Sequence, residues 1–196
     1  MKIAIILLYG IYTPDRKDYQ KYLDFIASEL TKYQYDKAIL CGGYTNPNIK
    51  NISEASSAKD YLRSKTDYDK YILEDKSINS NQNLEFASKF ISKDEEITVY
   101  CDLIRVAKIF WMSAHFLLNT PYIDISKAMI EYTAGKDIYK PFIYRNLKVV
   151  GFDFEEKSKE EMIGQSFATA IDIISLYDEE IEKLDIKQRK KDFGLS

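Results

Sequence analysis

The sequence predicts an α/β protein in which helices flank a mostly parallel sheet of about five strands. Short apolar runs alternate along the chain with segments whose apolar residues recur at helical spacing. Such alternation is typical of βαβ units and of a parallel sheet. The 196 residues are 45% hydrophobic and 30% charged, which suits a globular protein with a substantial core. We therefore expect one domain over 1–196.

The first strand is expected over 3–9, because this continuous apolar run suits a strand that is buried on both faces. Gly10 ends the run. A helix is expected over 15–33, where apolar residues recur every three or four positions. A second strand is expected over 37–41. Parallel strands need such a helical crossover between them, so this unit starts the sheet.

The next helix is expected to begin at Ser53, since serine favours helix N-caps. A short strand over 68–73 then leads to a third helix, which one of the residues 79–81 caps. A strand over 97–101 leads almost directly into a helix over about 103–118. These elements continue the alternation and extend the same sheet.

The pattern loosens after residue 118. We interpret 119–145 as an insertion with a short helix within 122–135 and extended chain over 138–144. A strand is expected over 147–154, and a long C-terminal helix over about 158–184. The residues expected to face inward on that helix are apolar: Met162, Phe167, Ala170, Ile171 and Ile174.

Three polar residues share helix faces with apolar ones. Glu54, Asn83 and Arg105 each lie near the start of a predicted helix, and residues at i, i+4 and i+7 share a face. Polar groups on a buried face must be paired or must face a cavity. A polar pocket shared by three helices would explain them, as would caps and salt bridges between helices. The apolar residues in phase with them are Ala58 and Tyr61, Ala87 and Phe90, and Ile109 and Met112.

Glycines follow the first two strands. Gly42 and Gly43 allow positive φ and a close backbone approach. Exposed amide groups there and at the next helix start would favour an anion such as phosphate or carboxylate. A tight turn without a ligand is an equal alternative, and Gly10 has the same two interpretations. Neither glycine site forms a Gly-x-Gly-x-x-Gly or Walker motif.

Four carboxylates lie near the expected strand ends: Glu54, Glu74, Asp75 and Asp102. Two or more of them together would suit Mg²⁺, general acid–base chemistry or a ribose diol. Their spacing does not choose among these uses. For Asp75 we favour a solvated surface position. No direct metal ligand is assigned.

Composition argues against several classes of protein. The net charge is −3, so the chain has no excess of basic residues such as proteins that bind nucleic acid have. We interpret the basic segment 187–192 as a charged, fraying end. The first apolar run is too short to span a membrane and has no cleavage site for a signal peptide. We therefore expect a cytoplasmic protein with a small-molecule anionic ligand, and neither nucleic acid nor membrane as a partner.

Cys41, Cys101 and His115 offer little reactive chemistry. Two cysteines form neither a disulfide framework nor a zinc set, and a single histidine excludes a multi-histidine metal site. Both cysteines end predicted strands, but a reactive thiolate needs a nearby cation. His115 lies more than two turns into its helix. We interpret the cysteines as buried and inert, and the histidine as a packing residue.

These polar residues form a pattern that resembles the DUF218 family, which includes the YdcF-like and SanA-like proteins. In that family a strand ending in Gly-Gly precedes Ser-Glu-Ala, then Glu-x-x-Ser-x-Asn-Thr-x-x-Asn, then His-x-x-Arg-Ala. The resemblance covers roughly 3–108, with Ser80 in place of the family threonine. The matching residues are Gly42, Gly43, Ser53, Glu54, Ala55, Glu74, Ser77, Asn79, Asn83 and Arg105.

The resemblance implies a Rossmann-like three-layer fold with a ligand pocket at the carboxyl ends of the strands. One branch of the family binds S-adenosylmethionine, and membrane-anchored branches are tied to cell-envelope synthesis. Asp102 stands where the family has histidine, which puts the family's chemistry in doubt here. The candidate catalytic residues are Glu54, Glu74 and Asp102. The candidate ligand-binding residues are Gly10, Gly42, Gly43, Ser53, Ser77, Asn79, Ser80, Asn83 and Arg105.

Three hypotheses follow. The chain is an enzyme that acts on a nucleotide, a phosphorylated compound or an adenosyl compound such as S-adenosylmethionine, with Mg²⁺ as an optional cofactor. Alternatively, it is a non-catalytic sensor or interaction module that kept the pocket, as Asp102 and the aromatic-rich segment 122–144 suggest. In the third hypothesis the polar residues form only a structural network.

Overall fold

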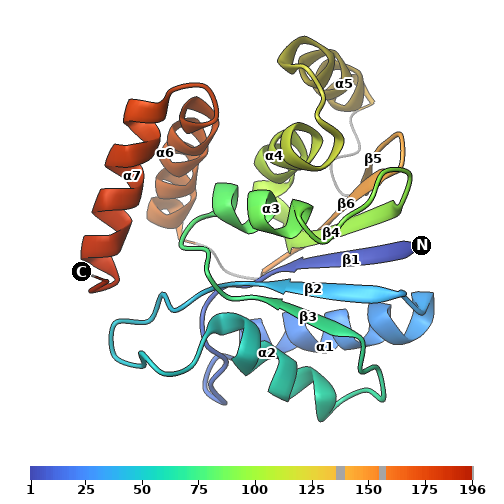
Figure 1. Cartoon of the computed structure of the whole chain (residues 1–196), viewed down its shortest axis with the longest axis vertical. Helices are drawn as coiled ribbons and strands as arrows, with labels where there is room; N and C mark the ends of the chain where they lie inside the picture. The colour runs from blue at the N-terminus through green and yellow to red at the C-terminus, as the bar shows by residue number, and fades with distance from the viewer. Residues whose placement is uncertain (136–139, 155–157, 196) are drawn as a thin grey trace.

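The structure is a computed structural model that describes residues 1–135, 140–154 and 158–195. Its centre is a six-stranded sheet with the strand order β3-β2-β1-β4-β6-β5 (Figure 1). Five strands are parallel, and β5 pairs antiparallel with β6. The predicted fold class is confirmed, with one strand more than expected. The strands are β1 (Lys2–Leu7), β2 (Lys37–Cys41), β3 (Tyr71–Glu74), β4 (Glu96–Asp102), β5 (Phe142–Tyr144) and β6 (Leu147–Phe152).

Helices cover both faces of the sheet, as expected of a Rossmann-like three-layer fold. In Figure 1, α1 and α2 lie below the sheet and α3, α4 and α5 above it, while α6 and α7 stand at one side. Within the described residues, every helix is too short or too polar to cross a lipid bilayer. The helices are α1 (Lys17–Tyr33), α2 (Glu54–Arg63), α3 (Ser80–Ser88), α4 (Val106–Leu118), α5 (Tyr122–Ala134), α6 (Lys159–Ser175) and α7 (Glu179–Asp192), with a 3₁₀ turn over Leu103–Arg105.

The core lies in two layers because the central strands are buried on both faces. Ile3 and Ile5 of β1 pack with α3, α4 and α5, whereas Ala4 and Ile6 pack with α1 and α2. All four residues are fully buried. Successive side chains of a strand point to opposite faces, so a strand covered on both sides must be apolar throughout. This requirement explains the continuous apolar run at the start of the chain.

The segment 119–145 contains one helix and one short strand. The helix α5 packs Ile125 and Ala128 on the core, and β5 joins the edge of the sheet beside β6. The expected helix within 122–135 is confirmed, as is extended chain at 142–144. Residues 136–139 lie outside the described residues. The segment therefore contributes both to the sheet and to the core.

The single C-terminal helix expected over about 158–184 is wrong, because the chain breaks between α6 and α7. The side chain of Asp178 accepts hydrogen bonds from the amides of Glu180 and Ile181, at 3.0 and 3.2 Å, and so caps a new helix. Acidic residues follow in the first turn of α7, and basic residues fill its last turn. Both distributions stabilise a separate helix through its dipole. The fraying end expected over 187–192 is also wrong, because these residues form the last turns of α7.

The inward face predicted for α6 is also wrong. Its buried residues are Asp172 and Ser175, and Asp172 forms an ion pair with Lys108 of α4 at 2.7 Å. Both side chains of the pair are almost completely buried. Burial of an ion pair fixes the orientation of the helix, since neither charge can be left unpaired in the interior. The predicted inward residues instead face outward: Met162, Phe167, Ala170, Ile171 and Ile174.

Two glycines allow the chain after β3 to cross the end of β2. Gly42 donates its amide hydrogen to the carbonyl oxygen of Glu74 at 2.9 Å, which extends the β2–β3 pairing. A Cβ atom on Gly43 would overlap the carbonyl oxygen of Ser77 and lie 3.1 Å from that of Asp75. Both obstacles are backbone atoms, so a side chain here would push one loop off the other.

We predict that Gly43→Ala destabilises the fold by about 1–3 kcal/mol, because overpacked sites of this kind cost that much. Gly164→Ala is the matched control, since its Cβ would have no neighbour within 4 Å in an exposed part of α6. The control is expected to stabilise the fold by about 0.5–1 kcal/mol. Urea unfolding followed by circular dichroism measures both. Equal effects of the two substitutions would contradict the steric explanation.

Candidate functional site

A cavity of about 350 Å³ lies at the carboxyl ends of the parallel strands. β1 pairs with β2 on one side and with β4 on the other, so the strand order runs outward from it in both directions. Such a reversal leaves a crevice where ligands of α/β proteins bind. The cavity is lined by Leu8, Tyr9, Gly10, Gly42, Gly43, Thr45, Glu54, Ser77, Ile78, Asn79, Ser80, Asn83, Arg105, Arg189 and Phe193.

The three polar residues identified by helix phase meet in this cavity. Glu54 is the first residue of α2, Asn83 lies in the first turns of α3, and Arg105 directly precedes α4. Parallel strands place the starts of their following helices at one edge of the sheet. The residues that extend the same helix faces are buried, as at Ala58 and Ile109, except Phe90. Phe90, which helix phase predicts to face inward, lies beyond the end of α3 and is 40% exposed. The helix starts therefore present polar groups to the cavity while the helix bodies pack on the core.

Arg105 is a cation for which the described part of the chain supplies no acceptor. Its guanidinium lies 4.8 Å from the ring centroid of Tyr9, a cation–π distance. Within the described residues its buried Nε atom has no hydrogen-bond partner, and the side chain forms no ion pair. A buried donor left unsatisfied costs about 1–3 kcal/mol. Arg105 thus has unused donors, and it lines the cavity.

Glu54 is a buried carboxyl group at the same cavity, with 7% of its surface exposed. The hydroxyl of Thr45 donates a hydrogen bond to it. Burial raises the pKa of the Glu54 carboxyl above its ordinary range. This hydrogen bond, the nearby backbone of Gly10 and the charges of Arg16 and Arg105 oppose that shift. A carboxyl group with a raised pKa is suited to carry a proton closer to neutral pH.

The amides at the start of α2 do not serve an anion, contrary to one expectation from the sequence. Glu54 and Ala55 donate their amide hydrogens to the carbonyl oxygens of Gly43 and Gly42, at 3.0 and 2.9 Å. The amide of the next helical residue donates to the side chain of Ser53 at 3.0 Å. Ser53 is thus the predicted N-cap, but it does not line the cavity. The Gly42–Gly43 pair serves mainly to receive α2 and the loop after β3.

The start of α3 is open to the cavity. Asn79 caps the helix by accepting from the amide of Gln82 at 2.9 Å. Ser77 donates a hydrogen bond to the side chain of Asn83, which fixes both at the cavity wall. Within the described chain, the amide of Ser80, a residue of the cavity lining, has no protein acceptor. Helix N-terminal amides carry partial positive charge, so this wall adds a donor to those of Arg105.

Two candidate catalytic residues do not line the cavity. Glu74 is 4% exposed, and its Oε1 atom accepts from the amides of Lys76 and Ser77, at 2.9 and 3.1 Å. Asp102 caps the 3₁₀ turn before Arg105, and its amide donates to the Tyr9 hydroxyl at 2.6 Å. Glu74 thus shapes the loop that carries Ser77, and Asp102 positions Arg105 and Tyr9.

The four carboxylates identified from the sequence differ in their relation to the cavity. Of Glu54, Glu74, Asp75 and Asp102, only Glu54 lines the cavity. No three His, Cys, Asp or Glu side chains of the described ranges gather as metal ligands do. Cys41, Cys101 and His115 also lie outside the cavity lining. Burial raises the pKa of the Cys41 thiol and lowers that of the His115 imidazole.

The sequence interpretation missed six residues of the cavity lining. Four of them lie next to or near predicted site residues along the chain: Leu8, Tyr9, Thr45 and Ile78. Arg189 and Phe193 come from the C-terminal end of α7 and its cap, far from the motif residues along the chain. Nothing in their local sequence distinguishes Arg189 from the lysines around it. Helix phase places Arg189 on the side of α7 opposite Lys187, but it does not indicate which side faces the cavity.

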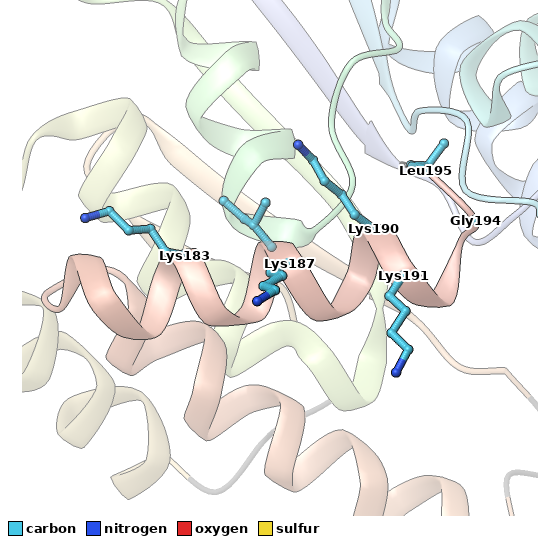
Figure 2. Close-up of a pocket in the computed structure, with 7 residues that line it drawn as sticks. Lys183, Lys187, Lys190, Lys191, Gly194 and Leu195 are labelled. Carbon is cyan, nitrogen blue, oxygen red and sulfur yellow. The ribbon is translucent and has the colours of Figure 1, made fainter.

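A larger cavity of about 700 Å³ lies on the outer side of α7. Ile186 and Leu195 supply its apolar surface, and lysines surround it. Figure 2 shows that the labelled lysines point in different directions along the helix rather than toward one point. None of the residues identified from the sequence motifs lines it. Because its charges do not converge, we place the candidate site in the smaller cavity.

Comparison of the chain with protein-family models found no model that matches, and a search of curated proteins found no match either. The chemistry of the cavity residues is therefore the basis for assigning a ligand.

Proposed function

We propose that the chain binds a small phosphorylated compound in the cavity at the carboxyl ends of the strands. The observation that carries this proposal is Arg105, whose guanidinium lines the cavity without a protein acceptor in the described chain. The amide of Ser80, which has no protein acceptor in the described chain, adds a donor at the start of α3. Arginine and helix N-terminal amides are the groups that recognise phosphate most often. The resemblance to the DUF218 family supports the same location.

The residues fit a phosphorylated ligand better than S-adenosylmethionine. That cofactor carries a net positive charge, whereas the cavity offers two arginines and one carboxyl group whose pKa is raised by burial. Glu54 is the one carboxylate in the described lining that can accept from a ribose diol. The rings of Tyr9 and Phe193 also line the cavity. Rings of this kind stack on flat groups, so a nucleotide would satisfy both the charges and the rings.

Glu54 favours a second candidate function, which is acid–base catalysis on the bound compound. Its carboxyl group is buried, has a raised pKa and lies beside the cation that would hold the ligand. These are the properties of a general acid or base. Asp102, in the position of the family histidine, does not line the cavity. Turnover of a phosphorylated compound, followed by ³¹P NMR, distinguishes an enzyme from a sensor that only binds.

We predict that Arg105→Gln weakens the binding of inorganic phosphate and of adenosine monophosphate by about 10- to 100-fold. Hydrogen bonds between charged groups are worth about 1.5–3 kcal/mol, which corresponds to this range. Isothermal titration calorimetry measures the affinities. S-adenosylmethionine, titrated in parallel, is expected to bind more weakly than the phosphorylated compounds.

Arg145→Gln is the matched control for this substitution. Arg145 also lies over a tyrosine ring, at 5.0 Å from the centroid of Tyr144, but it precedes β6 at the opposite end of the sheet. Its replacement is expected to leave phosphate binding unchanged. Phosphate binding that Arg105→Gln does not weaken, or that Arg145→Gln weakens equally, would refute the proposed site.

We predict that the affinity for sulfate falls as the pH rises through the pKa of Glu54. The raised pKa keeps this carboxyl protonated to a higher pH than in the unfolded chain. Its ionisation then adds negative charge beside the anion, and about 1 kcal/mol of repulsion corresponds to an affinity loss of about fivefold. Sulfate suits the test because its own charge is constant over this range.

The substitution Glu54→Gln should remove this pH dependence, because the amide keeps the shape of the carboxyl group without its charge. Calorimetry between acidic and neutral pH, on the wild-type chain and the variant, measures the effect. A pH dependence that persists in the variant would assign the titrating group elsewhere.

A further inference from the structure

Arg189 brings a second guanidinium to the cavity from outside the sheet. Its Nε donates to both carboxylate oxygens of Asp185, at 3.0 and 2.8 Å, and its Nη2 donates to Asp172 at 3.1 Å. Nη1 has no acceptor among the described residues, and the side chain lines the cavity. The guanidinium is planar and carries five donors in a fixed fork. Two carboxylates thus fix its direction and leave Nη1 for a ligand.

The carboxylates that hold Arg189 are themselves anchored. Asp172 is 1% exposed and also accepts from the ammonium of Lys108 at 2.7 Å. Asp185 accepts from the side-chain amide of Asn79 at 3.0 Å, and Asn79 lines the same cavity. This network connects α7 to α3, α4 and α6. A ligand group that meets Arg189 therefore meets a side chain that is already ordered, which lowers the entropic cost of binding.

Two of the three cations near this network are paired with its carboxylates. Asp172 and Asp185 neutralise Lys108 and Arg189, whereas Arg105 has no ion-pair partner in the described chain. Burial lowers the pKa of Lys108, and the charges of Arg105 and Arg189 lower it further, against the attraction of Asp172. Both arginines thus act on one buried lysine beside the cavity. Glu54, whose pKa is raised by burial, is the one remaining carboxyl group of the described lining that can offset the charge of Arg105.

We propose that Arg105 and Arg189 together recognise a ligand with two linked phosphate groups, such as a diphosphate ester. This inference rests on the phosphate-binding function proposed above and adds the class of ligand. The two guanidiniums come from different elements, Arg105 from the end of β4 and Arg189 from α7. Two linked phosphates offer each arginine its own set of oxygens. Charge-assisted hydrogen bonds between guanidinium and phosphate are among the strongest in proteins.

The test compares pyrophosphate with inorganic phosphate on the full chain by calorimetry. The wild-type chain is expected to bind pyrophosphate at least about tenfold more tightly than phosphate, since the second arginine adds about 1.4 kcal/mol or more. Arg189→Gln should abolish this preference and leave phosphate binding largely intact. Lys187→Gln, which removes a positive charge on the outer side of the same helix, should leave the preference unchanged.

The outcomes separate this inference from the function on which it rests. Phosphate binding that depends on Arg105, together with a pyrophosphate preference that Arg189→Gln does not change, overturns the role of Arg189 and keeps the proposed function. Absence of the preference in the wild-type chain has the same meaning. Failure of both anions to bind, or binding that Arg105→Gln leaves unchanged, refutes the proposed function and this inference with it.

The substitution at position 189 leaves Asp185 without its arginine, so a second variant keeps the test valid. Arg189→Gln combined with Asp185→Asn removes both charges of the pair and avoids an unpaired carboxylate. Trp111 of α4 is the one tryptophan of the chain. Its indole N–H donates a hydrogen bond, at 3.0 Å, to the hydroxyl of Tyr177, which lies in the link between α6 and α7. Its fluorescence should therefore report whether the two helices stay docked. With docking intact, a retained pyrophosphate preference in the double variant overturns the proposal, and a lost preference supports it.

Discussion

Parallel pairing of β1 with both β2 and β4 is the constraint on which the site depends. It brings the carboxyl ends of the central strands, and the starts of the helices after them, to one edge of the sheet. Close contact at that edge is possible only because Gly42 and Gly43 have no side chains where Glu54 and the loop after β3 approach. The same geometry that closes the core thus gathers helix starts, backbone donors and an arginine around one cavity.

The helix pair α6–α7 docks in a different way from the rest of the fold. Its contacts with the rest of the fold include buried polar ones: the ion pair of Asp172 with Lys108, and the hydrogen bonds from Asn79 to Asp185 and from Asn81 to the backbone of Asp172. Polar contacts of this kind fix direction more strictly than apolar packing, because unpaired buried groups are costly. They place Arg189 at the cavity and leave the apolar side of α6 exposed to solvent.

Local chemistry explains what the sequence could predict. Helix phase correctly predicted that Glu54, Asn83 and Arg105 lie at one site. The position of each residue depends only on the phase of its own helix and on the parallel sheet. The face of α6 could not be predicted in this way. Hydrophobic periodicity assumes that apolar residues point inward. In α6 the face that carries Asp172 points inward instead, because Asp172 forms a buried ion pair. Arg189 could not be predicted for a related reason, since only the tertiary structure brings the end of α7 to the cavity.

The position of Asp102 shows where proton chemistry can reside in this cavity. Its amide donates to the hydroxyl of Tyr9, and its carboxylate caps the turn that carries Arg105. Through these two hydrogen bonds Asp102 fixes the orientation of Arg105 and of the Tyr9 ring that the guanidinium contacts. Glu54, by contrast, lines the cavity and is desolvated beside Arg105. Under the function proposed above, Glu54 is therefore the carboxyl group of the described lining placed to move a proton, on the opposite side of β1 from the end of β4.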